Sequence, residues 1–112
     1  MTPTVGTAWA LLVVAGLLEI VWALGLKYSD GFTKPLPSVV VIVGAAASFW
    51  LLSIAMRVLP AGTAYAVWVG IGAVGTFLVS VTWRQETTNP ANLLAMAALV
   101  LSIVAVKVTA PH

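Results

Sequence analysis

A single carboxylate, that of Glu19, lies near the middle of an apolar run of residues 5–26 that contains no other charged residue. A charged side chain at the centre of a lipid bilayer costs from about 2.5 to more than 10 kcal/mol. Glutamate is also too short to reach the membrane interface from that depth. Glu19 must therefore face a cavity or another helix, hold a proton part of the time, or bind a cation, and each alternative indicates transport.

Two side chains are placed to donate hydrogen bonds to this carboxylate. Trp22 follows Glu19 by one helical turn, and its indole N–H either reaches the carboxylate or faces lipid. Ser48 lies in the middle of a second apolar run, where its hydroxyl either bonds the backbone carbonyl one turn earlier or serves the carboxylate. We expect both residues to orient Glu19. Gly16, one turn before Glu19, leaves room for another helix or a substrate to approach.

A third apolar run carries two aromatic residues, Tyr65 and Trp68, on one helix face. Aromatic residues at this spacing usually pack against neighbouring helices, but an aromatic wall beside a carboxylate also holds a cation. We therefore expect both to line a pocket. Gly70, Gly72 and Gly75 follow in the same run. Such a cluster either allows close packing or lets the helix bend, and a bend would help the two ends of a cavity to open in turn.

The fourth apolar run has no charge near its middle, but it carries a stripe of small residues. Ala98, Ser102 and Ala105 follow one another at spacings of four and three, which places them on one helix face. Small residues on one face let the backbones of two membrane helices approach closely. The stripe therefore predicts a contact between copies of the chain. Lys107, at the end of this run, is expected to extend its ammonium group to the membrane interface.

The elements that must position these residues are membrane-spanning helices. The chain has 112 residues, of which 62% are hydrophobic and 7% are charged, whereas a soluble domain is about one quarter charged. A spanning helix takes about 20 apolar residues, so the chain has room for four spans and little else. We predict an all-α membrane protein with one domain over residues 1–112 and helices at about 5–26, 38–58, 63–83 and 91–108. Short connections should make consecutive helices antiparallel neighbours.

The positive charges are almost balanced between the two ends of the predicted spans. Lys27, Lys34 and Arg84 lie at one end, and Arg57 and Lys107 lie at the other. The excess of Lys and Arg that normally fixes the orientation of a membrane protein is therefore nearly missing. This balance permits the chain to insert in both directions and to form an antiparallel homodimer. Two oppositely inserted copies would supply the inverted symmetry on which many transporters rely for alternating access.

Several other kinds of chemistry find no support in the sequence. The chain has no cysteine, and its one histidine, His112, is terminal, so we predict neither a metal site nor a catalytic nucleophile. No glycine-rich loop with a lysine indicates a nucleotide, and the few cations are too sparse for a nucleic-acid surface. We therefore expect no enzyme activity and no cofactor, and membrane lipid is the expected surrounding.

Three stretches of sequence together carry a family resemblance. Residues 19–33 read EIVWALGLKYSDGFT, residues 48–53 read SFWLLS, and residues 59–75 read LPAGTAYAVWVGIGAVG. Over nearly its whole length the chain resembles the small multidrug resistance family of four-helix transporters, and within that family the guanidinium exporter subtype. The resemblance implies an antiparallel, dual-topology homodimer in the bacterial cytoplasmic (inner) membrane that exchanges protons for guanidinium or substituted guanidinium.

The resemblance also implies a role for each residue singled out above. Glu19 would be the shared binding site of the proton and the substrate. The carboxylate would be oriented by Trp22 and Ser48, and the pocket would be lined by Tyr65, Trp68 and Gly16. The hinge would be formed by Gly70, Gly72 and Gly75, and the dimer contact by Ala98, Ser102 and Ala105.

Two features of the chain depart from the family pattern. An acid–proline pair usually follows the third span, but here Glu86 and Pro90 are separated by three residues, and Ser102 and Ala105 stand where glycines are common.

Two rival functions stay open. One is an exporter of quaternary ammonium or other bulky hydrophobic cations. The other is a non-transporting membrane subunit whose Glu19 pairs with a helix of a larger complex.

Overall fold

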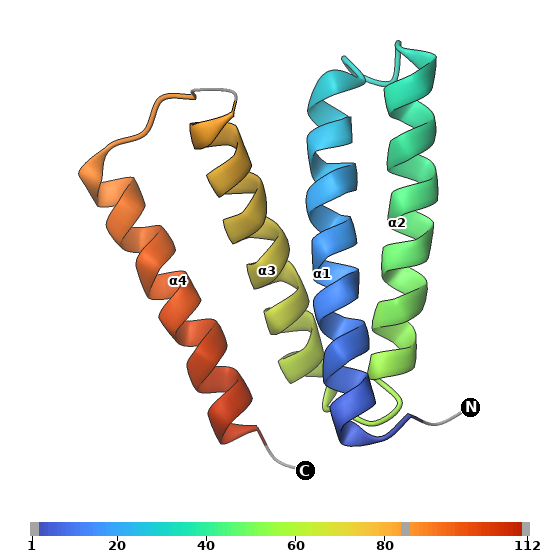
Figure 1. Ribbon diagram of the computed structural model, residues 1–112, viewed down its shortest axis with the longest axis vertical. Coiled ribbons are helices and arrows are strands. Elements are labelled where there is room, and N and C mark those ends of the chain that lie inside the picture. The colour runs from blue at the N-terminus through green and yellow to red at the C-terminus, as the bar shows by residue number, and fades with distance from the viewer. Residues whose placement is uncertain (1–2, 84–85, 111–112) are drawn as a thin grey trace.

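The computed structural model describes residues 3–83 and 86–110, and within these ranges the chain forms four α-helices and no strand (Figure 1). The helices are α1 (Val5–Tyr28), α2 (Pro35–Ala55), α3 (Ala61–Thr82) and α4 (Pro90–Thr109). Each is long and apolar enough to cross a membrane. The predicted all-α, four-span fold is therefore confirmed. Arg84 and His112 lie outside the described residues.

The helix ends follow local sequence signals. Thr4 caps α1 by accepting a hydrogen bond from the backbone N–H of Thr7 at 3.1 Å, and Asn89 caps α4 in the same way. α2 begins at Pro35, three residues earlier than predicted, because the first turn of a helix tolerates proline. It also ends three residues earlier, at Ala55.

The helices lie side by side in the order α2, α1, α3, α4 (Figure 1). α1 packs against both α2 and α3, whereas α4 packs mainly against α3. α2 and α3 touch only slightly although a short link joins them, so the expectation that consecutive helices are packed neighbours is wrong for this pair. The link instead carries the chain past α1, which occupies the space between them.

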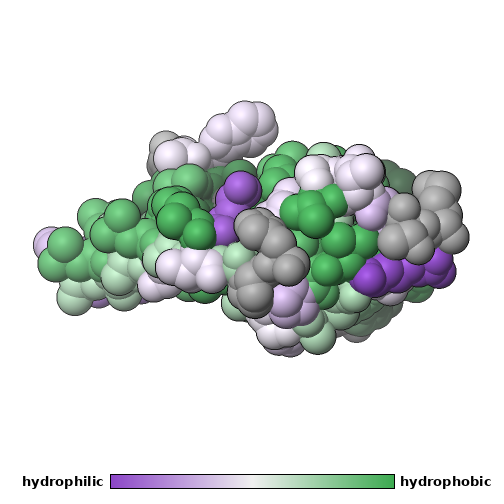
Figure 2. All heavy atoms as spheres, turned by 90° about the horizontal axis from the view of Figure 1, so that it is seen from below, coloured by the Kyte–Doolittle hydropathy of each residue, from purple (hydrophilic) through white to green (hydrophobic). Residues whose placement is uncertain are grey.

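The packed part of the molecule is thin. The Cα atoms extend over 40 × 35 × 17 Å, so the helices form a single layer and do not enclose a core on all sides. Small residues allow the closest approaches, and Ala8, Ala15, Ala55 and Ala64 have no exposed surface. On the face seen from below, hydrophobic residues lie in broad areas and strongly hydrophilic residues are confined to small patches (Figure 2). Lipid or another protein chain must cover this surface.

Candidate functional site

The carboxyl group of Glu19 lies against the backbone of α3 at Gly72. A methyl group placed on Gly72 would overlap Oε1, Cδ and Cγ of Glu19. Both residues lie near the middle of their helices, so this contact is deep within the predicted hydrocarbon region. Glycine at position 72 therefore makes room for the one carboxylate that the first span carries.

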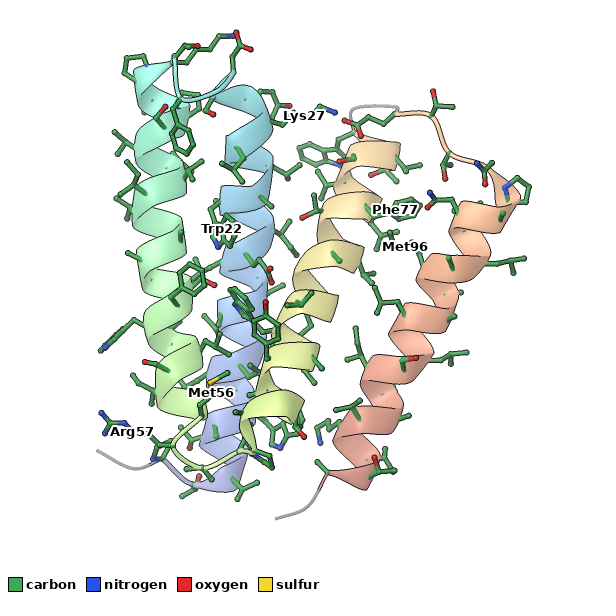
Figure 3. The ribbon with its side chains drawn as sticks, turned by 180° about the vertical axis from the view of Figure 1, so that it is seen from behind. Trp22, Lys27, Met56, Arg57, Phe77 and Met96 are labelled. Atoms are coloured by element: carbon green, nitrogen blue, oxygen red, sulfur yellow. The ribbon has the colours of Figure 1, made fainter. Side chains whose placement is uncertain are left out.

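Two polar atoms beside this contact are buried without a partner. Oε1 of Glu19 and Nε1 of Trp22 have no hydrogen-bond partner among the described residues. Trp22 lies on the side of α1 that faces α2, with its Cβ packed next to Gly44 (Figure 3). An unsatisfied buried donor or acceptor costs about 1–3 kcal/mol, and such groups commonly mark sites of function. An acceptor and a donor, both without a partner among the described residues, thus lie one helical turn apart on α1.

Ser48 joins three helices through its hydroxyl group. The fully buried hydroxyl donates to the backbone carbonyl of Ala15 in α1 at 2.7 Å and accepts from Nε1 of Trp68 in α3 at 2.9 Å. In the described structure Ser48 therefore bonds neither its own helix nor the carboxylate of Glu19. The carbonyl of Ala15 is also the acceptor that helix geometry assigns to the backbone N–H of Glu19. Ser48 thus contacts the helical turn that carries Glu19.

Four aromatic rings from three helices form a continuous wall. The ring centroids of Trp22 and Phe49 are 6.1 Å apart, those of Phe49 and Trp68 are 5.1 Å apart, and those of Tyr65 and Trp68 are 5.7 Å apart. Trp68 is buried, but Phe49 and Tyr65 each expose about half of their surface. The wall is therefore accessible to a ligand. Sequence reasoning missed Phe49 as a site residue, and its position next to Ser48 was the signal that pointed to it.

The glycines of α3 receive side chains from the neighbouring helices. A side chain on Gly70 would overlap Ile103 of α4, and one on Gly75 would overlap Ile20 of α1. Close packing, one of the two readings of this cluster, thus occurs at both positions, and α3 runs as one continuous helix through them. Whether these glycines also form a hinge stays a prediction.

Gly16 and the small residues of α4 lie away from the aromatic wall. A methyl group on Gly16 would lie 2.7 Å from Cγ2 of Ile71, so Gly16 belongs to the contact between α1 and α3. Ala98, Ser102 and Ala105 are all exposed, and α4 buries none of its residues. The structure therefore brings Glu19 against Gly72 and joins Trp22, Tyr65 and Trp68 through Phe49, while the α4 stripe takes part in neither arrangement.

An ion pair connects the end of α1 to the segment between α3 and α4. Lys27 pairs with the carboxylate of Glu86, towards which its side chain extends (Figure 3). The backbone N–H of Glu86 also donates to the carbonyl of Ser80 at 3.0 Å. The segment that departs from the expected acid–proline pattern is thus attached to the helix that carries Glu19.

The chain is similar to known proteins over most of its length. A family model described as Small Multidrug Resistance protein matches residues 7–101. A guanidinium exporter from Yersinia pseudotuberculosis serotype I (strain IP32953) is 50% identical over 100 residues, covering 89% of this chain and 96% of the relative. Guanidinium exporters from Citrobacter freundii and Escherichia coli (strain K12) are each 48% identical over 102 residues, covering 91% of this chain and 97% of each relative.

Proposed function

Because the chain belongs to the small multidrug resistance family of membrane transporters, we propose that it exports guanidinium or substituted guanidinium cations in exchange for protons. It is an integral membrane protein of the bacterial cytoplasmic membrane, and it is a transporter, not an enzyme. The observation that carries the proposal is the buried, unpartnered carboxyl oxygen of Glu19 beside an open aromatic wall. The relatives named guanidinium exporters give the class of cation.

The chemistry of the site suits a flat cation. A guanidinium group donates two parallel N–H bonds to the two oxygens of a carboxylate, whereas a quaternary ammonium group has no N–H to donate. Its plane also stacks on aromatic rings. Glu19 supplies the carboxylate, and the exposed rings of Phe49 and Tyr65 supply surfaces for stacking. The carboxylate therefore favours guanidinium over a tetra-alkyl ammonium ion, whereas the aromatic rings can hold either cation.

Exchange follows from competition for one carboxylate. A proton on Glu19 removes its negative charge and occupies the oxygen that a guanidinium N–H would approach. Suppose that a proton and a cation cannot bind at the same time, and that the protein switches between its inward-open and outward-open states only with one of them bound. Inward movement of protons then drives export of the cation. In this account Trp22 and Ser48 orient Glu19, and Ser48 acts through the backbone of Ala15.

The transporting unit in this proposal is an antiparallel homodimer. A single layer of helices, 17 Å thick, leaves both of its faces uncovered. The exposed stripe of Ala98, Ser102 and Ala105 offers a surface for close contact with a second copy. Two copies of Glu19 brought together in this way would titrate as a coupled pair. The three glycines of α3 would then form the hinge by which each copy changes shape.

The proposal is tested by reconstituting the purified chain into liposomes and imposing a pH gradient. Guanidinium should move against the proton gradient, and Glu19→Gln should abolish the coupled flux while the protein still purifies as a folded dimer. A panel that includes tetra-alkyl ammonium ions separates the rival functions. Stronger coupled flux of the ammonium ions would favour an exporter of bulky cations. No coupled flux of any cation would favour a non-transporting subunit.

A further inference from the structure

An apolar groove runs between α1 and α4, with α3 as its floor. Two adjoining cavities of about 320 Å³ each make up the groove, and they share Ile71 of α3 together with Ile103 and Val104 of α4. This size reaches the lower end of the roughly 300–1,000 Å³ that small-molecule sites occupy. Nearly all of the side chains that line it are aliphatic. The groove therefore suits a hydrocarbon chain.

The groove opens on a different face from the site at Glu19. Successive residues of an α-helix are rotated by roughly 100° about its axis. By this spacing Val13 and Leu17, which line the groove, lie roughly 120–160° around α1 from Glu19. On α3, Val67, Ile71 and Val74 of the groove lie roughly 100–160° from Gly72, and Gly75 at the inner end lies roughly 60° from it. A ligand in the groove would thus be separated from the carboxylate by the packed helices.

The groove is as long as one leaflet of a membrane. Its lining on α1 extends from Trp9 to Ile20, which corresponds to about 16 Å along the helix axis. The hydrocarbon core of a bilayer is about 30 Å thick, so a single leaflet is about half of that. The inner end of the groove lies where Ile20 packs against Gly75. An acyl chain that entered from the interface would therefore fill the groove along its length.

A positive charge stands at the outer end of the groove. The ammonium group of Lys107 lies 5.1 Å from the ring centroid of Trp9, and both residues line the groove within two turns of a helix end. Trp and Lys near helix ends lie at the level of the lipid headgroups, and basic residues there attract anionic lipids. The contact with Trp9 holds the ammonium group over the entrance. The entrance thus suits the phosphate group of a lipid.

A second copy of the chain does not compete for this groove in the proposed dimer. The stripe formed by Ala98, Ser102 and Ala105 is exposed on α4. Val100 and Lys107, which line the groove, lie roughly half a turn around the helix from the middle of that stripe. A partner that covers the stripe therefore leaves the groove facing lipid.

We propose that this groove binds one acyl chain of an anionic phospholipid, with the phosphate group of the lipid against Lys107. The inference does not depend on which cation the protein exports, because none of the residues that line the groove is Glu19, Gly72 or a member of the aromatic wall. Removing the charge should therefore change the choice of lipid headgroup at the groove and leave other lipid contacts unchanged.

Quenching by brominated lipids tests this site directly. The chain has no cysteine, so Leu17→Cys places a single fluorophore on the rim of the groove, where Leu17 is 52% exposed. Val43→Cys on α2 is the matched control, because Val43 is 63% exposed and lines none of the groove. Each labelled protein is reconstituted in phosphatidylcholine vesicles with increasing fractions of brominated phosphatidylglycerol or brominated phosphatidylcholine.

The label at position 17 should reach half-maximal quenching at a several-fold lower fraction of the brominated phosphatidylglycerol, and the label at position 43 should not distinguish the two lipids. Lys107→Gln should remove the preference, whereas Lys107→Arg and Lys34→Gln, a charge removed at the other end, should keep it. Equal quenching by both lipids at position 17, or a preference that survives Lys107→Gln, would overturn the proposal. No quenching by either lipid there would also overturn it and would show that protein covers the groove.

Discussion

The carboxyl group of Glu19 lies directly against the backbone of Gly72, so that even a methyl group at position 72 would overlap it. This contact fixes the side of α3 on which the carboxyl group lies. It also explains why a charged residue is tolerated in the middle of α1, because the carboxyl group lies between two helices and does not point into lipid. The proposed exchange of proton for cation takes place at this contact.

Gly72→Ala should displace the carboxyl group of Glu19 and impair transport. A displacement of about 1 Å at a reacting group can cost about 10²-fold in rate, and we expect a loss of that order in guanidinium-coupled proton flux. Gly62→Ala, at the start of the same helix, is the control, because a methyl group there would meet nothing within 4 Å. Flux in liposomes measures both variants, and an active Gly72→Ala protein would contradict the assigned contact.

Ser48→Ala should weaken both stability and transport. It leaves the indole N–H of Trp68 without its acceptor and removes a donor from the carbonyl of Ala15, at a cost of about 1–3 kcal/mol. Ser53→Ala is the control, since its hydroxyl donates to the backbone carbonyl of Trp50 in the same helix.

The orienting role of Ser48 needs a readout that a purely structural role would not change. The pH dependence of guanidinium binding should shift in Ser48→Ala relative to the unaltered chain, because the turn that carries Glu19 has moved. The double variant Ser48→Ala with Trp68→Phe should lose less free energy of unfolding than the sum of the two single variants, because both changes remove the same hydrogen bond. An unshifted pH profile would reduce Ser48 to a packing residue.

Trp22→Phe should lower the affinity for guanidinium while leaving the fold intact. The change removes the buried N–H that has no partner among the described residues, and it keeps an aromatic ring next to Phe49. In the proposed bound state this N–H donates to the carboxylate of Glu19, and a hydrogen bond to a charged group is worth about 1.5–3 kcal/mol, so we expect a loss of at least about tenfold in affinity. Trp50→Phe, at a ring that is 65% exposed, should have no effect. Equal affinities of the two variants in a binding titration would argue against a role for the indole N–H.

A bulky residue in the α4 stripe should prevent assembly. Ala105→Trp places a large side chain where two backbones are expected to approach closely, so the protein should elute from a sizing column as a smaller species. Leu93→Trp is the control, because Leu93 lies roughly 120° around α4 from Ala105 and is already 48% exposed. A dimer that tolerates Ala105→Trp would place the contact elsewhere.

The number of helices and their approximate ends could be predicted from hydrophobic runs and turn residues, because each helix depends mainly on its own sequence. The partners of Ser48 could not be predicted in this way. Its bonds to Ala15 and Trp68 depend on the register of three helices packed together, and periodicity within one helix does not determine that register. The position of α1 between α2 and α3 escaped prediction for a similar reason, since a short link does not force packing.

The site was predicted in part. Glu19 could be singled out because a charge in an apolar run is costly, and Tyr65 and Trp68 because they share a helix face. Phe49 was missed, since one more aromatic residue in an apolar run is ordinary and only its position next to Ser48 set it apart. Gly72 could be singled out as part of a glycine cluster that allows either close packing or a bend, but its contact with Glu19 comes from the crossing of α1 and α3.

The central claim is that a proton and a guanidinium ion compete for Glu19, and a binding titration at several pH values tests it most directly. With purified protein in detergent, the apparent affinity for guanidinium should fall as the pH is lowered, because protonation removes the charge that the cation needs. If a single proton competes with the cation, the apparent affinity can fall by at most about tenfold for each pH unit. Glu19→Gln should abolish both the binding and its pH dependence. Affinity that is independent of pH in the unaltered chain, or binding that persists in Glu19→Gln, would contradict the account.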